Sequence, residues 1–339
     1  MRIDLRSDTV TKPSPEMYNA MNEAKVGDDV FGEDEAINEL EHKTAAWFGM
    51  QAGLYCPSGT MTNQLAIKCH TQPGDEVICD ESSHIYQYEG GGIAFNSGCS
   101  VKLLYGNNGR LSANQVAQAI NKNEDIHKSH SRMVSLENTS NRGGGSCYDW
   151  DQIRDIKNVC TANNLAFHLD GARVWNAIVA NNENPLWYGE AFDSLSVCFS
   201  KGLGAPVGSV LLGDKNLIKK ARRFRKIFGG GMRQSGILAA ACTYALENNI
   251  ERLRIDHQHA LAISNALEQK DFVKLILPVS TNIIIFETHT PEQTSAFVNH
   301  MLSKDIQLFA IAPNRVRIVL HLDVSNNMVD YVLTQVNML

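Results

Sequence analysis

The sequence lacks the features that mark membrane, secreted and nucleic-acid-binding proteins. No apolar run approaches the roughly 18 residues of a membrane span, and charged residues at the start replace the apolar segment of a secretory signal. With 31 Lys and Arg against 37 Asp and Glu, the net charge of −6 offers no general attraction to nucleic acid. The eight cysteines form no Cys-x-x-Cys pair, which indicates reduced core thiols. We expect a cytoplasmic protein with no metal site and with no membrane or nucleic-acid partner.

Short apolar runs alternate with amphipathic stretches over the first 215 residues. The predicted strands are 53–56, 76–79, 101–104, 133–136, 166–169, 196–199 and 209–212. Such strands, apolar on both faces and separated by helices, indicate a mostly parallel sheet that is covered on both sides.

The pattern changes after Met232. Helices are predicted over 235–247, 250–269 and 292–303, and strands over 282–286 and 316–320. We therefore predict a large α/β domain over 1–247 and a smaller α+β domain over 248–339. No internal repeat or low-complexity linker divides the chain.

The first of four chemically suggestive segments is a turn formed by Ser58, Gly59 and Thr60. It follows a predicted strand and opens a predicted helix. Backbone N–H groups, a hydroxyl and the positive helix end can together bind an anion there. An ordinary capped helix start is the alternative.

The second segment places Asp170 at the carboxyl end of a predicted strand, where α/β sheets bind ligands. This carboxylate can hold a protonated ring nitrogen or a metal. His168 faces the same side of the strand and is suited to a hydrogen bond with it. A structural ion pair between Asp170 and Arg173 is the alternative.

The third segment places Lys201 directly after a strand and before a Gly-x-Gly turn. A desolvated lysine amine is a nucleophile that forms a Schiff base with a carbonyl. A dinucleotide-binding loop does not fit, because Val207 occupies the third glycine position. A solvated lysine is the alternative.

The fourth segment is His84, shortly before three consecutive glycines. Such a histidine can stack on a flat ligand or act as a base, and a satisfied loop histidine is the alternative. A lysine, an aspartate and an anion-binding turn together are what pyridoxal 5'-phosphate requires.

Seven motifs then carry a resemblance to a known family. In chain order they are RSDTVT at 6–11, VGDDVFG at 26–32, PSGT at 57–60, LENT at 136–139, HLDGAR at 168–173, SKGLGAPVG at 200–208 and GGGMRQ at 229–234. With these motifs in this order, the chain from residue 3 to about residue 325 resembles the L-threonine aldolases.

The resemblance implies the aspartate-aminotransferase-like fold, fold type I of pyridoxal phosphate enzymes. In that fold a seven-stranded, mostly parallel sheet forms the large domain. The implied reaction is retro-aldol cleavage of L-threonine, L-allo-threonine and other L-β-hydroxy-α-amino acids to glycine and an aldehyde. The implied assembly is a homotetramer, a dimer of dimers with shared active sites.

The resemblance also implies roles for individual residues. Lys201 would bind the cofactor aldehyde, Asp170 the pyridine nitrogen, and His84 would stack on the ring. The phosphate would be held by Ser58, Gly59 and Thr60, with Lys226 and Arg233 reaching a neighbour's phosphate. The substrate carboxylate would be received by Ser7, Arg173 and Arg317. Glu89 would also contact the substrate, and Arg173 the cofactor. The base stays open between His84, His127 and a water held by these histidines or by Glu89.

One motif departs from the family pattern. Ser140 stands where many bacterial members have histidine, and three glycines follow at 143–145. A β-eliminating lyase or a serine hydroxymethyltransferase of the same fold is the main alternative function. A non-catalytic scaffold is the alternative from another class. The sequence does not determine the preference between threonine and allo-threonine.

Overall fold

The seven predicted strands form one sheet in the computed structural model, which describes residues 2–121 and 124–339. They are β2 (Ala52–Cys56), β3 (Asp75–Asp80), β4 (Ser100–Leu104), β5 (His130–Glu137), β6 (Ala166–Gly171), β7 (Ser194–Cys198) and β8 (Ser209–Gly213). The order across the sheet is β2-β8-β7-β6-β5-β3-β4. Only β8 runs against its neighbours β2 and β7, so the predicted mostly parallel sheet is confirmed.

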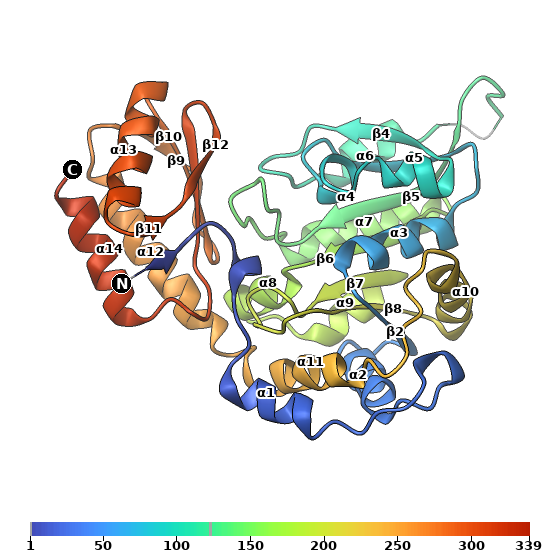
Figure 1. The fold of residues 1–339 in the computed structure, drawn as a ribbon. Coiled ribbons are helices and arrows are strands. Elements are labelled where there is room, and N and C mark those ends of the chain that lie inside the picture. The colour runs from blue at the N-terminus through green and yellow to red at the C-terminus, as the bar shows by residue number, and fades with distance from the viewer. Residues whose placement is uncertain (1, 122–123) are drawn as a thin grey trace.

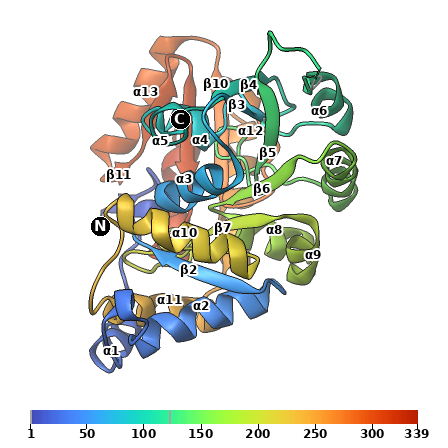
Figure 2. The same cartoon turned by 90° about the vertical axis from the view of Figure 1, so that its right-hand side faces the viewer.

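Helices cover both faces of this sheet (Figure 2). One face carries α3 (Gly59–His70), α4 (His84–Gln87), α5 (Gly92–Ser97) and α10 (Lys215–Ile227). The other carries α6 (Ala113–Ala119), α7 (Trp150–Ala162), α8 (Val174–Asn181) and α9 (Pro185–Ala191). Every residue of β7 and β8 is buried, which explains the apolar run Val210–Leu212 in β8. The buried serines of β7 have hydrogen-bond partners, Ser194 with His168 and Ser196 with Thr62.

Three further helices pack together at one end of the sheet: α1 (Pro15–Asn22), α2 (Glu35–Trp47) and α11 (Gly236–Asn248). Short 3-10 turns lie at Asp8–Val10 and Asp29–Phe31. No helix of the described residues is long and apolar enough to cross a membrane.

The C-terminal part is a separate α+β layer, drawn in orange and red in Figure 1. It contains α12 (Leu253–Glu268), β9 (Val273–Ile276), β10 (Ile283–Thr288), α13 (Pro291–Ser303), β11 (Ile306–Gln307), β12 (Phe309–Ala312), β13 (Arg315–Val319) and α14 (Asn326–Asn337). Four strands pair antiparallel in the order β12-β13-β10-β9. The sequence pattern missed β9 and β12 because neither strand has a fully buried residue, so the apolar signal is weak.

The first residues of the chain belong to this C-terminal layer. The strand β1 (Ile3–Asp4) pairs parallel with β11, and Ile3 and Leu5 pack in the same core as Phe286 and Ile318. The helix α12 joins the two bodies, because Leu253 lies in the core of the large sheet and Ala260 in the second core. The predicted domain boundary at residue 248 stays a prediction.

Candidate active site

A cavity of about 320 Å³ lies between the large sheet and the C-terminal strands. Five of the predicted site residues line it, although they are spread over more than 300 positions: Ser7, His84, Arg173, Lys201 and Arg317. Its other lining residues are Thr9, Tyr88, Asn141, Arg142, Phe309 and Ile311.

Lys201 lies in the turn after β7, where its side chain reaches the cavity. The turn closes with a hydrogen bond of 2.9 Å from the Gly204 N–H to the Lys201 carbonyl. Gly204 has a φ of +80°, a value that strongly favours glycine. The Gly-x-Gly after the lysine therefore shapes the turn that presents it.

Asp170 is the next-to-last residue of β6 and is almost completely buried. Its Oδ1 accepts the Ala172 backbone N–H at 3.1 Å, and its Oδ2 accepts from the Asn63 amide nitrogen at 3.0 Å. The same nitrogen donates to Glu89 Oε1 at 2.8 Å. Asn63, on α3, therefore bridges two buried carboxylates, and the sequence analysis did not single it out.

His168 acts on Asp170 through Asn63 and not directly, as the shared strand face had suggested. Its Nε2 lies 3.1 Å from Asn63 Oδ1, and its Nδ1 lies 2.8 Å from Ser194 Oγ. Burial lowers the pKa of His168 to about 3, so the ring is neutral. The amide nitrogen of Asn63 faces two carboxylate oxygens, so the amide oxygen of Asn63 is the atom that faces His168. This oxygen can only accept a hydrogen bond, which assigns the proton of the His168 ring to Nε2.

His84 begins α4, and its Nδ1 lies 3.0 Å from Glu89 Oε1. Burial alone would lower the pKa of His84, but the Glu89 hydrogen bond and the charge of Asp170 raise it above its usual value. The Glu89 side chain is fully buried and also accepts from Gln64 at 2.7 Å. Glu89 therefore reaches the cavity only through His84, and its predicted substrate contact stays a prediction.

Glu137, in the LENT motif, binds the backbone of two residues that line the cavity. Its two oxygens accept the backbone N–H groups of His84 at 2.8 Å and Asn141 at 2.9 Å. Burial, together with the charge of Asp170, raises the pKa of Glu137 to about 7. One carboxyl group thus positions both His84, which is predicted to stack on the cofactor ring, and the loop that carries Asn141.

Arg173 pairs with Asp8 and not with Asp170, so the ion pair considered as an alternative is not formed. Its Nε and Nη2 each donate to an Asp8 oxygen at 2.7 Å, and both side chains are buried. Burial alone would raise the pKa of Asp8, but Arg173 lowers it to about 2. Asp8 lies in the RSDTVT motif, but no sequence feature predicted its pairing with Arg173.

Arg317 reaches the cavity from β13. It donates to Asn141 Oδ1 at 2.8 Å and to the Arg6 carbonyl at 3.1 Å. Burial, with the charge of Arg173, lowers the pKa of Arg317 to about 10, so the group remains a cation near neutral pH. Its buried Nε has no hydrogen-bond partner in the part of the chain that the structure describes, which fits an arginine awaiting an anion.

The predicted phosphate turn lies at the N-terminus of α3. Ser58 Oγ accepts the Met61 N–H at 3.1 Å, so Ser58 does cap the helix, as the alternative held. A Cβ at Gly59 would meet Ser209 Oγ at 3.6 Å, and this buried hydroxyl has no partner within the described residues. The unpartnered hydroxyl beside the helix end supports an anion site.

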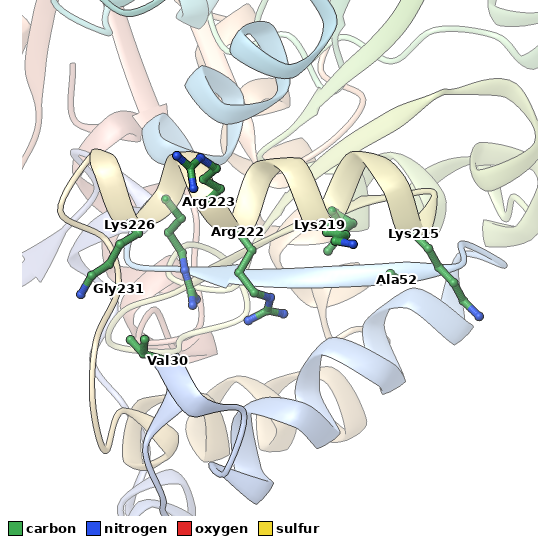
Figure 3. Close-up of a pocket in the computed structure, with 10 residues that line it drawn as sticks. Val30, Ala52, Lys215, Lys219, Arg222, Arg223, Lys226 and Gly231 are labelled. Carbon is green, nitrogen blue, oxygen red and sulfur yellow. The ribbon is translucent and has the colours of Figure 1, made fainter.

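Eight predicted site residues, all within the described part, do not line the cavity: Ser58, Gly59, Thr60, Glu89, Asp170, His127, Lys226 and Arg233. His127 is exposed in the segment between α6 and β5. Arg233 is exposed and donates to Asp28 Oδ2 at 2.7 Å. Lys226 lies on the basic groove along α10, of about 570 Å³, drawn in Figure 3.

The structure also brings together a set of possible metal ligands that sequence spacing did not reveal. Ligand atoms of His84, Glu89 and Asp170 all lie within 4.8 Å of one another. Both carboxylates already accept N–H groups, and Asp170 lies beside the histidine predicted to stack on a ring. This donor set equally suits a protonated ring nitrogen, because a carboxylate oxygen can accept more than one hydrogen bond.

Comparison with known proteins identifies the family of this chain. The family model for beta-eliminating lyases matches residues 4–291. The low specificity L-threonine aldolase of Escherichia coli K12 is 40% identical over 95% of this chain and 95% of its own length. A probable low-specificity L-threonine aldolase 2 of Arabidopsis thaliana is 38% identical over 98% of this chain and 95% of its own length.

Solved structures agree in fold. The threonine aldolase of Leishmania major superposes with a TM-score of 0.87 at 19% identity and covers 99% of both chains. A putative L-allo-threonine aldolase of Listeria monocytogenes superposes with a TM-score of 0.81 at 19% identity. The match covers 99% of this chain and 96% of the Listeria chain. From its motifs, its site and its sequence identity over nearly its whole length, this chain belongs to the L-threonine aldolase family of the beta-eliminating lyases.

Proposed function

We propose that the protein is a pyridoxal phosphate-dependent aldolase that cleaves L-threonine, L-allo-threonine and related L-β-hydroxy-α-amino acids. The products are glycine and an aldehyde, which is acetaldehyde for threonine. The observation that carries this proposal is the convergence of Lys201, His84 and Arg317 on one cavity, with Asp170 buried beside His84. The family membership supports the same reaction.

The residues present fit the cofactor. Lys201 offers the amine for its aldehyde, Asp170 retains acceptor capacity for its ring nitrogen, and the N-terminus of α3 offers N–H groups to its phosphate. Ser209, the buried hydroxyl without a described partner, lies beside that helix end. When bound, the cofactor supplies a ring that takes up the electron pair of the broken Cα–Cβ bond.

The chain itself binds and orients the substrate. Arg317 presents a planar fork that matches the α-carboxylate, with Ser7 and Arg173 beside it. Glu89 holds Nδ1 of His84, so Nε2 is the atom available to take the β-hydroxyl proton. Lys201 can return a proton to Cα once the bond has broken. His127, or a water held by the histidines, remains the second candidate for the base.

We further propose a homotetramer with active sites shared between subunits. The support is the place of His127, Lys226 and Arg233 outside the cavity of their own chain. On this proposal they act at a neighbouring subunit's site. A cytoplasmic location is proposed from the eight cysteines, which are all free and buried.

The test is aldehyde release from L-threonine and L-allo-threonine in parallel, with pyridoxal phosphate present. Acetaldehyde from either substrate supports the proposal, and the ratio of the two rates gives the Cβ preference. Ammonia and pyruvate would instead indicate a β-eliminating enzyme, and folate dependence a hydroxymethyltransferase. Lys201→Ala is the control, because it should lose both turnover and the Schiff-base absorbance. A normal visible spectrum without any product would leave a non-catalytic scaffold.

A further inference from the structure

The cavity holds more positive charge than a substrate with one carboxylate requires. Four cationic side chains line it: Arg142, Arg173, Arg317 and Lys201. Arg173 is already neutralised by Asp8, and on the proposed function Lys201 binds the cofactor and Arg317 the α-carboxylate. Arg142 is left over, and no acidic side chain of the described residues forms an ion pair with it.

Arg142 is held in a defined position at this cavity. Its Nε donates to the Tyr88 hydroxyl, and its guanidinium carbon lies 5.0 Å from the centre of the Tyr88 ring. The Tyr88 ring in turn lies 5.7 Å from the ring of His84. Because Nε is used by the tyrosine, the terminal nitrogens of Arg142 are the donors that remain for a ligand.

The glycine-rich loop around Arg142 is packed against the protein. Ser140 and Ser146 pair as a β-bridge, with 3.0 Å between the Ser140 nitrogen and the Ser146 carbonyl oxygen. A Cβ at Gly143 would lie 1.9 Å from the Asn108 carbonyl oxygen, so only glycine fits there. The loop therefore presents Arg142 from a fixed backbone.

Arg142 and Arg317 belong to one connected group. Asn141, the neighbour of Arg142 in the loop, accepts a hydrogen bond of 2.8 Å from Arg317 Nη1. The charge of Arg142 also contributes to lowering the pKa of Arg317, although burial is the larger cause. Arg142 and Arg317 are like charges in one cavity and repel each other. A ligand that brings one anionic group to each arginine stabilises both charges.

We infer that this site favours a substrate with two carboxylates: a β-hydroxy-α-amino acid whose β-carbon bears a second carboxylate, which Arg142 binds. This inference rests on the proposed function. For 3-hydroxyaspartate the Cα–Cβ bond breaks, the β-hydroxyl loses its proton to the base, and Cα gains a proton. The products are glycine and glyoxylate, so atoms and electrons balance without a further reactant.

The test compares two substrates that differ only in charge, 3-hydroxyaspartate and its neutral amide 3-hydroxyasparagine, each as both β-epimers. The holoenzyme should prefer the acid by about 10-fold in kcat/KM, the lower end of what a hydrogen bond between charged groups contributes. Rising salt should reduce the preference, because Arg142 is half-exposed. L-Aspartate, which cannot undergo the cleavage, should inhibit threonine cleavage more strongly than L-asparagine does.

Two variants at this position separate charge from shape. Arg142→Gln should bring the acid-to-amide ratio close to 1 while threonine is still cleaved, and Arg142→Lys should retain part of the preference. Arg154→Gln, at an exposed site on α7, is the control and should change nothing.

Equal kcat/KM values for acid and amide in the unmodified enzyme would overturn the inference, whether or not the variants fold. A ratio that survives Arg142→Gln would overturn it as well. If threonine itself gives no aldehyde, the proposed function fails, and that outcome is distinct from cleavage of threonine without any preference for the acid.

Discussion

The amide nitrogen of Asn63 lies 3.0 Å from Oδ2 of Asp170, and this contact orients the carboxylate that we propose to bind the ring nitrogen of the cofactor. The same nitrogen donates to Glu89, which holds the ring of His84. One amide thus fixes the groups proposed to bind the ring nitrogen and to stack on the ring. It also places a donor between two carboxylates that would otherwise repel each other.

Replacing Asn63 by leucine should therefore weaken cofactor binding. Leucine has a similar volume but leaves Asp170 and Glu89 facing each other without a donor, at a cost of about 1–3 kcal/mol. The affinity for pyridoxal phosphate should fall roughly 10-fold or more, and the pH titration of the visible absorbance should shift. Gln64→Met is the matched control, because Gln64 contacts Glu89 but not Asp170. Equal effects of the two substitutions would contradict this role of Asn63.

The pair between Asp8 and Arg173 predicts a large stability effect. Both side chains are almost fully buried, so Asp8→Ala leaves an unpaired cation in the interior and should cost about 3–5 kcal/mol. The double variant Asp8→Leu with Arg173→Met removes both charges and should recover most of that loss. Urea unfolding of the two variants checks this, and equal destabilisation would count against a charge-based explanation.

His168 makes the folded protein sensitive to acid. The folded state holds this ring neutral down to about pH 3, whereas the unfolded chain protonates it near pH 6.5. Between these values the unfolded state binds the additional proton, so stability is lost as the pH falls from 6.5. The loss from this group is about 1.4 kcal/mol per pH unit. In His168→Gln the free energy of unfolding should fall less steeply between pH 6.5 and about 5. Parallel curves for the two proteins would refute this assignment.

Arg317→Ala should mainly weaken substrate binding. Losing the fork that receives the α-carboxylate should raise KM by about 10- to 100-fold, as expected for a hydrogen bond between charged groups. Arg315→Ala is the control, because Arg315 lies two residues away on β13 but pairs with Glu287. An unchanged KM in the Arg317 variant, or an equal rise in both, would argue against the carboxylate role.

Local sequence patterns carried much of the fold. The runs Val210–Leu212 in β8 and Ile283–Phe286 in β10 are apolar and buried at every position, and this pattern is visible in the sequence alone. In contrast, β12 has no fully buried residue and lies at the edge of the small sheet, so it produces no comparable pattern. Burial, more than strand propensity, determined which elements were found.

For the site, single residues after strands were predictable but their partners were not. Lys201 and Asp170 stand at strand ends within recognisable motifs. Asn63, one turn into a helix, resembles any polar helix residue, and its contacts with residues 26 and 107 positions away depend on tertiary structure. Asp8 was similarly missed, because its partner Arg173 lies 165 residues further along the chain.

The pairing of β1 with β11 has a consequence for how the protein is made. The residues of β1 leave the ribosome about 300 residues before their partners at Ile306 and Gln307. Until then Asp8, only four residues beyond β1, has no anchored segment to hold it against Arg173. The candidate cavity is therefore completed only after Gln307 has been synthesised, and the large sheet can form earlier without an assembled substrate site.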